Sequence, residues 1–148
     1  MKSKYFDISE VIPKILFYQY KDKGWKFIDT KLIETIDNIK ETFSTGEIYI
    51  NTYKNNGKDQ WNGLRVPECP FYSIHSLHSY GKAVNMTFLD YTIEEVRSHI
   101  ILNPDKFPYI KGIGMGSHLH IDVRNQDKVQ IFDNKGRVYQ IAEALALS

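Results

Sequence analysis

The sequence predicts a single α+β domain spanning residues 1–148, in which helices pack on one side of an antiparallel sheet. Three observations support this fold class: two amphipathic helical segments after Asp29 and Thr92, a strand-like alternation over residues 118–124, and a hairpin pattern near the C-terminus. The chain has 148 residues, of which 42% are hydrophobic, so it can bury a sizeable core.

The first half of the chain is predicted to be mainly helical. Residues 8–18 should begin with a short helix that is interrupted near Pro13. After Asp29, apolar residues recur at helical spacing until Gly46 ends the segment. Residues 47–53 have the composition of a strand. The polar segment 54–65 is rich in Gly and Asn, and its length suggests a functional loop.

The second half is predicted to contain one helix and most of the strands. Thr92 and Glu95 form a capping-box pattern that opens a helix, which Pro104 closes. His99 lies within this helix and is expected at its surface or end. Residues 112–116 should form a loop or a bulged edge before the strand at His118. Segments 129–132 and 137–141 then flank a turn, as in a hairpin.

Four of the five histidines lie in or next to two short polar clusters, residues 76–85 and 118–124. In a strand, the alternation of the second cluster would direct its aliphatic residues to one face. The other face would then carry His118, His120, Asp122 and Arg124. Imidazole is the commonest protein ligand of zinc and the usual proton-transfer group near neutral pH. Because packing gives no reason for such a face, the pattern predicts a functional site.

Composition excludes several classes of partner and site. The net charge of +1 gives no reason to expect binding of nucleic acid or of an anionic membrane. Cys69 is the only cysteine, so neither an internal disulfide nor a thiolate metal cluster can form. No apolar stretch is long enough for a secretion signal or a bilayer span. We therefore expect a cytoplasmic protein, released only by lysis.

The two histidine clusters resemble the signature of the LAS zinc peptidases. The matching pattern is Ser76-x-His78-x-x-Gly81-x-Ala83-x-Asn85, followed by His118-x-His120. This group includes D-Ala-D-Ala carboxypeptidases, phage L-alanoyl-D-glutamate endolysins and the hedgehog signalling domain. Residues 6–11, 28–32, 48–51 and 62–65 resemble further segments of these proteins in the same order, so the likeness covers most of the chain. The resemblance implies a hedgehog-like fold and zinc-dependent cleavage of peptidoglycan peptides.

The resemblance also implies roles for individual residues. The family's zinc ligands fall on His78, Asn85 and His120, and its substrate-orienting arginine falls on Arg65. In members with the His-x-His variant, the first histidine lies beside the metal, which places His118 among the catalytic residues. Two imidazoles and a carboxylate leave zinc an open position for water, and an arginine can stabilise the anionic intermediate that follows.

The sequence departs from the family pattern at two places that affect activity. Asn85 stands where the family has an aspartate ligand, and a neutral amide should bind zinc more weakly, so that the ion is held weakly or not at all. Residues 112–117 also lack the family's general-acid carboxylate, for which only His118 or Asp122 could substitute. Two explanations stay open: an impaired or repurposed catalyst, or a working enzyme silenced by substitution at position 85.

The missing carboxylates lead to a second function hypothesis. A pocket lined by Arg65 and several imidazoles would favour an anion. The residues expected to contact such a ligand are His75, Ser76, Asp122 and Arg124. The chain is then either a zinc-peptidase-like protein acting on small peptides, or a pseudo-peptidase that sequesters a small nucleotide-like or carboxylated anion. A third hypothesis is a hedgehog-like module for protein–protein interaction. The compact size would suit a virus-encoded product.

Overall fold

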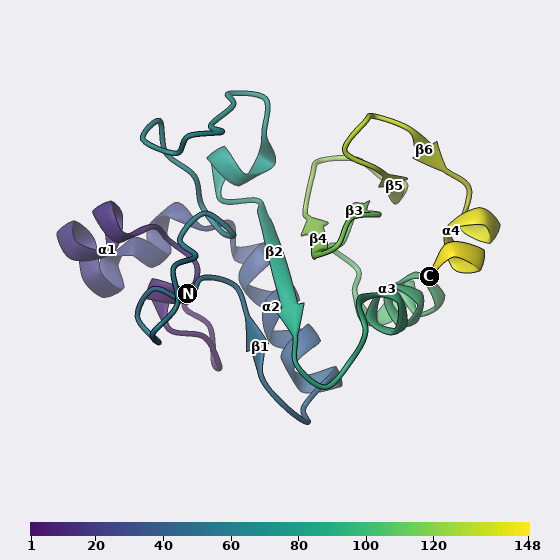
Figure 1. Ribbon diagram of the computed structural model, residues 1–148, viewed down its shortest axis with the longest axis horizontal. Helices are drawn as coiled ribbons and strands as arrows, with labels where there is room; N and C mark the ends of the chain where they lie inside the picture. The colour runs from purple at the N-terminus through teal and green to yellow at the C-terminus, as the bar shows by residue number, and fades with distance from the viewer.

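Six short strands form one mixed sheet in the order β1-β2-β4-β3-β5-β6 in the computed structural model, which describes residues 1–148 (Figure 1). The strands are β1 (Ile48–Tyr49), β2 (Ala83–Phe88), β3 (Gly112–Gly114), β4 (Leu119–Asp122), β5 (Gln130–Phe132) and β6 (Val138–Tyr139). All neighbours pair antiparallel except β3 and β5, which are parallel. The domain is therefore α+β, as the sequence predicted.

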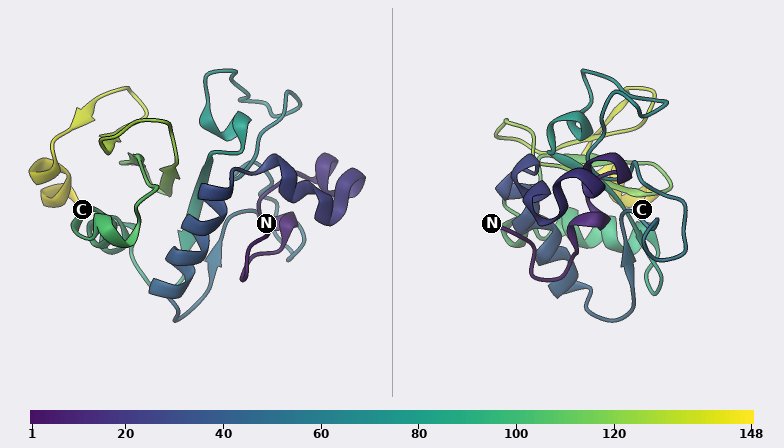
Figure 2. Two further views of the ribbon diagram at one scale, coloured as in Figure 1. Left: turned by 180° about the vertical axis from the view of Figure 1, so that it is seen from behind. Right: turned by 90° about the vertical axis from the view of Figure 1, so that its left-hand side faces the viewer.

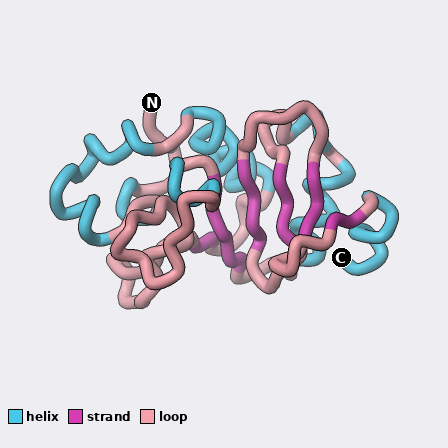
Figure 3. The backbone as a smooth tube through the Cα atoms, turned by 90° about the horizontal axis from the view of Figure 1, so that it is seen from above, coloured by secondary structure: helices cyan, strands magenta, loops and turns pink.

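The expectation of a purely antiparallel sheet is wrong at the β3–β5 pair. After β4 the chain passes to the far edge of β3, so that β5 runs in the same direction as β3. Residues 112–114 are likewise not an edge or a loop, because β3 lies between β4 and β5. Figure 3 shows neighbouring strands of this sheet side by side. The glycine-rich composition of β3 gave no strand signal, since glycine is depleted in ordinary strands.

Four α-helices and four 3₁₀ segments accompany the sheet. The α-helices are α1 (Lys14–Tyr20), α2 (Thr30–Thr42), α3 (Ile93–Leu102) and α4 (Ile141–Leu147), and the 3₁₀ segments are η1 (Ile8–Glu10), η2 (Lys21–Phe27), η3 (Leu77–Tyr80) and η4 (Pro104–Lys106). The predicted break at Pro13 separates η1 from α1. Helix α3 carries the predicted capping box between Thr92 and Glu95. Helix α4 was not predicted.

The two faces of the sheet differ in composition. On one face, Val84 and Met86 of β2 lie opposite Ile121 and Leu119 of β4, and all four side chains are completely buried. They join the apolar sides of α2 and α3 in a single core cluster. Figure 2 (left) shows α2 running alongside β2. The alternate residues of β2 and β4 must point to the other face, which carries the polar residues of the candidate site.

Several local expectations need correction. The strand predicted over residues 47–53 is limited to β1, and residues 54–65 contain no helix or strand, as expected of a loop. His99 lies in the last turn of α3, as one of the two expectations had it, but it is half-buried: its ring packs edge-to-face on Phe43 and Phe107, with centroid distances of 5.3 and 6.4 Å. The Cys69 thiol is buried. None of the helices has both the length and the apolar character needed to cross a membrane.

Candidate functional site

The register of β2 and β4 places Asn85 directly opposite His120. The Asn85 Oδ1 atom lies 3.0 Å from His120 Nδ1. The next pair of residues along the same face is Ala83 and Asp122. Sequence alternation therefore predicted the face of β4 correctly, and strand pairing adds Asn85 to it.

The second nitrogen of His120 is held by Asp122. His120 Nε2 lies 3.0 Å from Asp122 Oδ2, and Arg124 donates to both carboxylate oxygens of Asp122 at 2.7 Å. Burial raises the pKa of Asp122, but the hydrogen bonds from Arg124 and His120 outweigh it and bring the pKa to about 2. Because this carboxylate is charged, Nε2 of His120 donates to it, and Nδ1 is the nitrogen in contact with the Asn85 side chain.

Asp122 and Arg124 thus support His120. The Asp122 side chain is completely buried, whereas that of Arg124 is about a quarter exposed. Arg124 also donates to Gln130 Oε1 at 2.9 Å and stacks over Phe132, with 4.8 Å between its guanidinium carbon and the ring centroid. Phe132 in turn packs against His120 at 5.5 Å. Sequence analysis missed Phe132, because this residue reaches the site through the parallel β3–β5 pairing.

His78 enters the site from η3. Ser76 caps this turn through its side chain, and Gly81 ends it with a φ of 67°, in the left-handed region that favours glycine. The imidazole of His78 is only 3% exposed, and its Nδ1 lies 2.8 Å from the Gly63 carbonyl oxygen. A carbonyl can only accept, so Nδ1 carries the proton and Nε2 is the nitrogen without one.

The surroundings of His78 favour its neutral form. Burial is the largest cause, and the nearby Arg65 and His120 add to it, lowering the pKa of His78 to about 3 despite opposing hydrogen bonds to Gly63 and Asn85. Metal coordination requires an unprotonated imidazole nitrogen. His78 therefore presents such a nitrogen throughout the neutral range.

The two imidazoles are spaced as ligands of one ion would be. The ring centroids of His78 and His120 are 5.2 Å apart. Zinc–nitrogen bonds of about 2.0–2.1 Å in tetrahedral geometry place two such rings roughly 5 Å apart. The other nitrogens of the two rings, together with Asn85 Oδ1, are thus compatible with a three-ligand zinc site. The structure contains no group of three His, Cys, Asp or Glu residues placed to hold a metal ion.

Arg65 lies over the same hollow without a carboxylate partner. Its Nε donates to the Trp61 carbonyl at 2.8 Å, and its guanidinium carbon lies 4.7 Å from the centre of the Phe71 ring. Its backbone amide donates to the His78 carbonyl at 3.0 Å, which ties the two residues together. Burial lowers the pKa of Arg65, and no acidic side chain forms a salt bridge with it. The guanidinium is therefore available to an anion.

The structure brings most of the predicted site residues to one hollow of about 390 Å³. Those that line it are Arg65, Ser76, His78, Asn85, His118 and His120. His118 is exposed at its rim. His75 instead lines an adjacent hollow, together with Ser76, His120, Asp122 and Arg124.

The one carboxylate that lines the main hollow is Asp133, which sequence reasoning missed. Its Oδ1 accepts from the amides of Lys135 and Arg137 at 2.9 and 3.0 Å, and its Oδ2 accepts from the Tyr139 hydroxyl at 3.1 Å. Desolvation raises the pKa of Asp133, but the hydrogen bonds outweigh this effect, so that the pKa lies below its ordinary value. A carboxylate so engaged stabilises the turn between β5 and β6 and is a poor base.

Strand β3 makes room for the site. A Cβ atom at Gly112 would lie 2.1 Å from an oxygen of Asp122, and one at Gly114 would lie 2.8 Å from the Cβ of His120. Arg97 of α3, itself buried, fixes this segment by donating to the carbonyls of Gly114 at 3.1 Å and Gly116 at 2.8 Å. Neither the need for glycine in β3 nor the contact of Arg97 with this segment has a local sequence signal, because both depend on the strand order.

Comparisons with protein-family models, curated proteins and solved structures gave no match for this chain. The likeness to the LAS peptidases therefore depends on the quoted motifs alone.

Proposed function

We propose that this chain is a zinc-binding protein of the peptidoglycan-peptidase type, with His78, Asn85 and His120 as the metal ligands. One observation carries the proposal. Gly63 and Asp122 each engage one nitrogen of an imidazole, so that the other nitrogens of His78 and His120 are directed toward the Asn85 amide. Such outer partners are a general feature of histidine metal ligands.

The other residues would bind and orient a short peptide. Zinc would supply a Lewis acid that polarises a carbonyl and lowers the pKa of water. Arg65 would hold a carboxylate or a developing oxyanion, which its lack of an acidic partner favours. His118, exposed at the rim, would take the place of the general-acid carboxylate of the LAS peptidases in proton transfer. With no carboxylate ligand and no free carboxylate base, we expect slow hydrolysis.

Zinc titration of chelator-treated protein tests this proposal. We expect binding of one ion per chain, and a loss of affinity of about 100-fold or more in His120→Ala. His75→Ala is the matched control, because it removes an exposed imidazole of the adjacent hollow and should leave zinc affinity unchanged. Muropeptides should then be cleaved slowly and only with zinc present. Protein that takes up no zinc and leaves these peptides intact would refute the proposal.

The unpaired Arg65 supports a second candidate, a metal-free pocket that sequesters a small anion. In that case a nucleotide or carboxylated ligand should raise the thermal stability equally with and without chelator, and Arg65→Ala should abolish the effect. An anion effect that needs zinc would instead support the metal site.

A further inference from the structure

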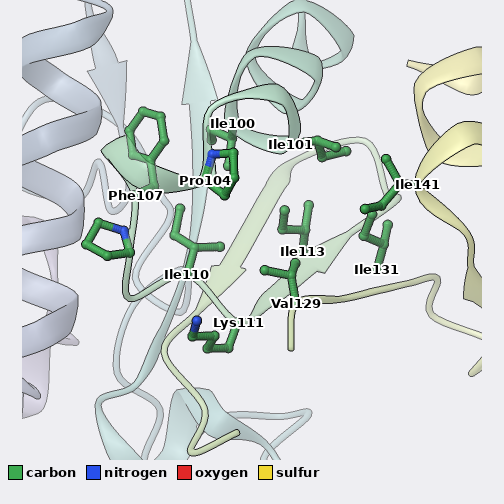
Figure 4. A pocket seen from close by; sticks show the side chains of 11 residues that line it. Ile100, Ile101, Pro104, Phe107, Ile110, Lys111, Ile113, Val129, Ile131 and Ile141 are labelled. Carbon is green, nitrogen blue, oxygen red and sulfur yellow. The ribbon is translucent and has the colours of Figure 1, made fainter. Parts of the chain in front are cut away.

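An apolar pocket lies on the opposite face of the strands that build the histidine site. It is bounded by α3, η4, β3, β5 and the start of α4, and its volume is about 110 Å³ (Figure 4). Ile113 of β3 and Ile131 of β5 form its floor, and they belong to the core face of the sheet. The pocket is therefore separated from the histidine hollow by the thickness of the sheet.

The lining of this pocket is almost entirely aliphatic and extends to solvent. Val129 and Ile141 stand at its edge, with 41% and 60% of their surfaces exposed. An engineered apolar cavity of about 150 Å³ stays free of water and binds benzene, so a space of this size suits a short aliphatic chain or one small ring. A bound apolar ligand would also cover the exposed side chains of Val129 and Ile141.

A single cation is present among these apolar residues. Lys111 lines the pocket, and its side chain has no acidic partner within salt-bridge distance. Its backbone is held on both sides, because its amide donates to the Asp122 carbonyl and its carbonyl accepts from the Gln130 amide, each at 2.9 Å. The backbone position of Lys111 is thus fixed at the pocket, and its side chain lines the pocket without a counter-charge.

We infer that this pocket binds a small monocarboxylate with a short aliphatic or single-ring body, which lies among the isoleucines while its carboxylate pairs with Lys111. The apolar lining favours the hydrocarbon part of the ligand, and the unpaired ammonium favours its negatively charged carboxylate. This site is independent of the zinc site and does not depend on the proposed peptidase function.

A homologous series of carboxylates tests the inference by NMR titration of the full chain in chelator. From butanoate to hexanoate, Kd should fall about fourfold for each added methylene. Hexan-1-ol, which lacks the charge, should bind several-fold more weakly than hexanoate. Lys111→Met should remove that difference, whereas Lys106→Met, a nearby exposed lysine outside the pocket, should preserve it.

Two further variants locate the binding site. Ile141→Trp places a large side chain at an exposed edge position and should abolish hexanoate binding without unfolding the protein. Arg65→Ala should leave hexanoate binding intact. A Kd that does not depend on chain length, or binding that survives Ile141→Trp and is lost in Arg65→Ala, would overturn the inference. Equal binding of hexanol and hexanoate would also contradict it.

Discussion

At the scale of single residues, the proposed zinc site depends on which atoms of each side chain are already hydrogen-bonded. His78 and His120 each have one nitrogen engaged, by Gly63 and Asp122, and one directed toward Asn85. Their identity was predictable from the spacing of the two motifs. Which nitrogen of each ring is directed toward Asn85 was not predictable, because it depends on partners brought in by distant segments.

Asp122 should make folding stability depend on acid pH. Its pKa in the folded protein, about 2, lies below its unfolded value of about 3.9. The stabilisation is therefore complete above about pH 5 and is lost progressively as the pH falls through 4 towards 1, amounting to about 2–3 kcal/mol. Denaturant unfolding at a series of pH values should show this loss in the wild type.

Asp122→Asn is the comparison for that measurement. The variant should be less stable at neutral pH, since it leaves Arg124 without its partner, and its stability should fall less steeply below pH 4. An equal pH dependence in both proteins would show that Asp122 is not the group responsible.

At the scale of elements, the two helices at Asp29 and Thr92 and the strand at His118 were predictable because each has a strong local signal in periodicity or capping. Strand β3 and its parallel neighbour β5 were not, since their pairing is set by the route of the chain. Asp133 and Phe132 reach the site through that pairing, and so escaped sequence analysis.

The glycines of β3 provide a test at this scale. Gly112→Ala should destabilise the domain by about 1–3 kcal/mol, because the added Cβ would overlap the buried Asp122 carboxylate. Gly116→Ala is the matched control, since no atom lies within 4 Å of a Cβ placed there. Urea unfolding compares the two. Equal stability of both variants would contradict the packing described for β3.

At the scale of the whole molecule, the proposed ion would join three separate segments: η3, β2 and β4. A ligand that binds only the folded state stabilises it by about 2.7 kcal/mol at one hundred times its Kd. For a chain of this size we expect zinc at that concentration to raise Tm by about 5–10 °C. Differential scanning calorimetry should show a rise that chelator reverses and that His78→Ala lacks. A Tm unaffected by zinc would count against a shared ion.

Asn85→Asp gives the most direct test of the central claim, that position 85 faces a metal together with His78 and His120. The substitution restores a carboxylate beside the two nitrogens directed toward position 85, and we predict at least a tenfold gain in zinc affinity by calorimetric titration. Thr87→Asp adds the same charge two residues along the same strand and should give no such gain. Unchanged affinity in Asn85→Asp, or an equal gain in Thr87→Asp, would contradict the claim.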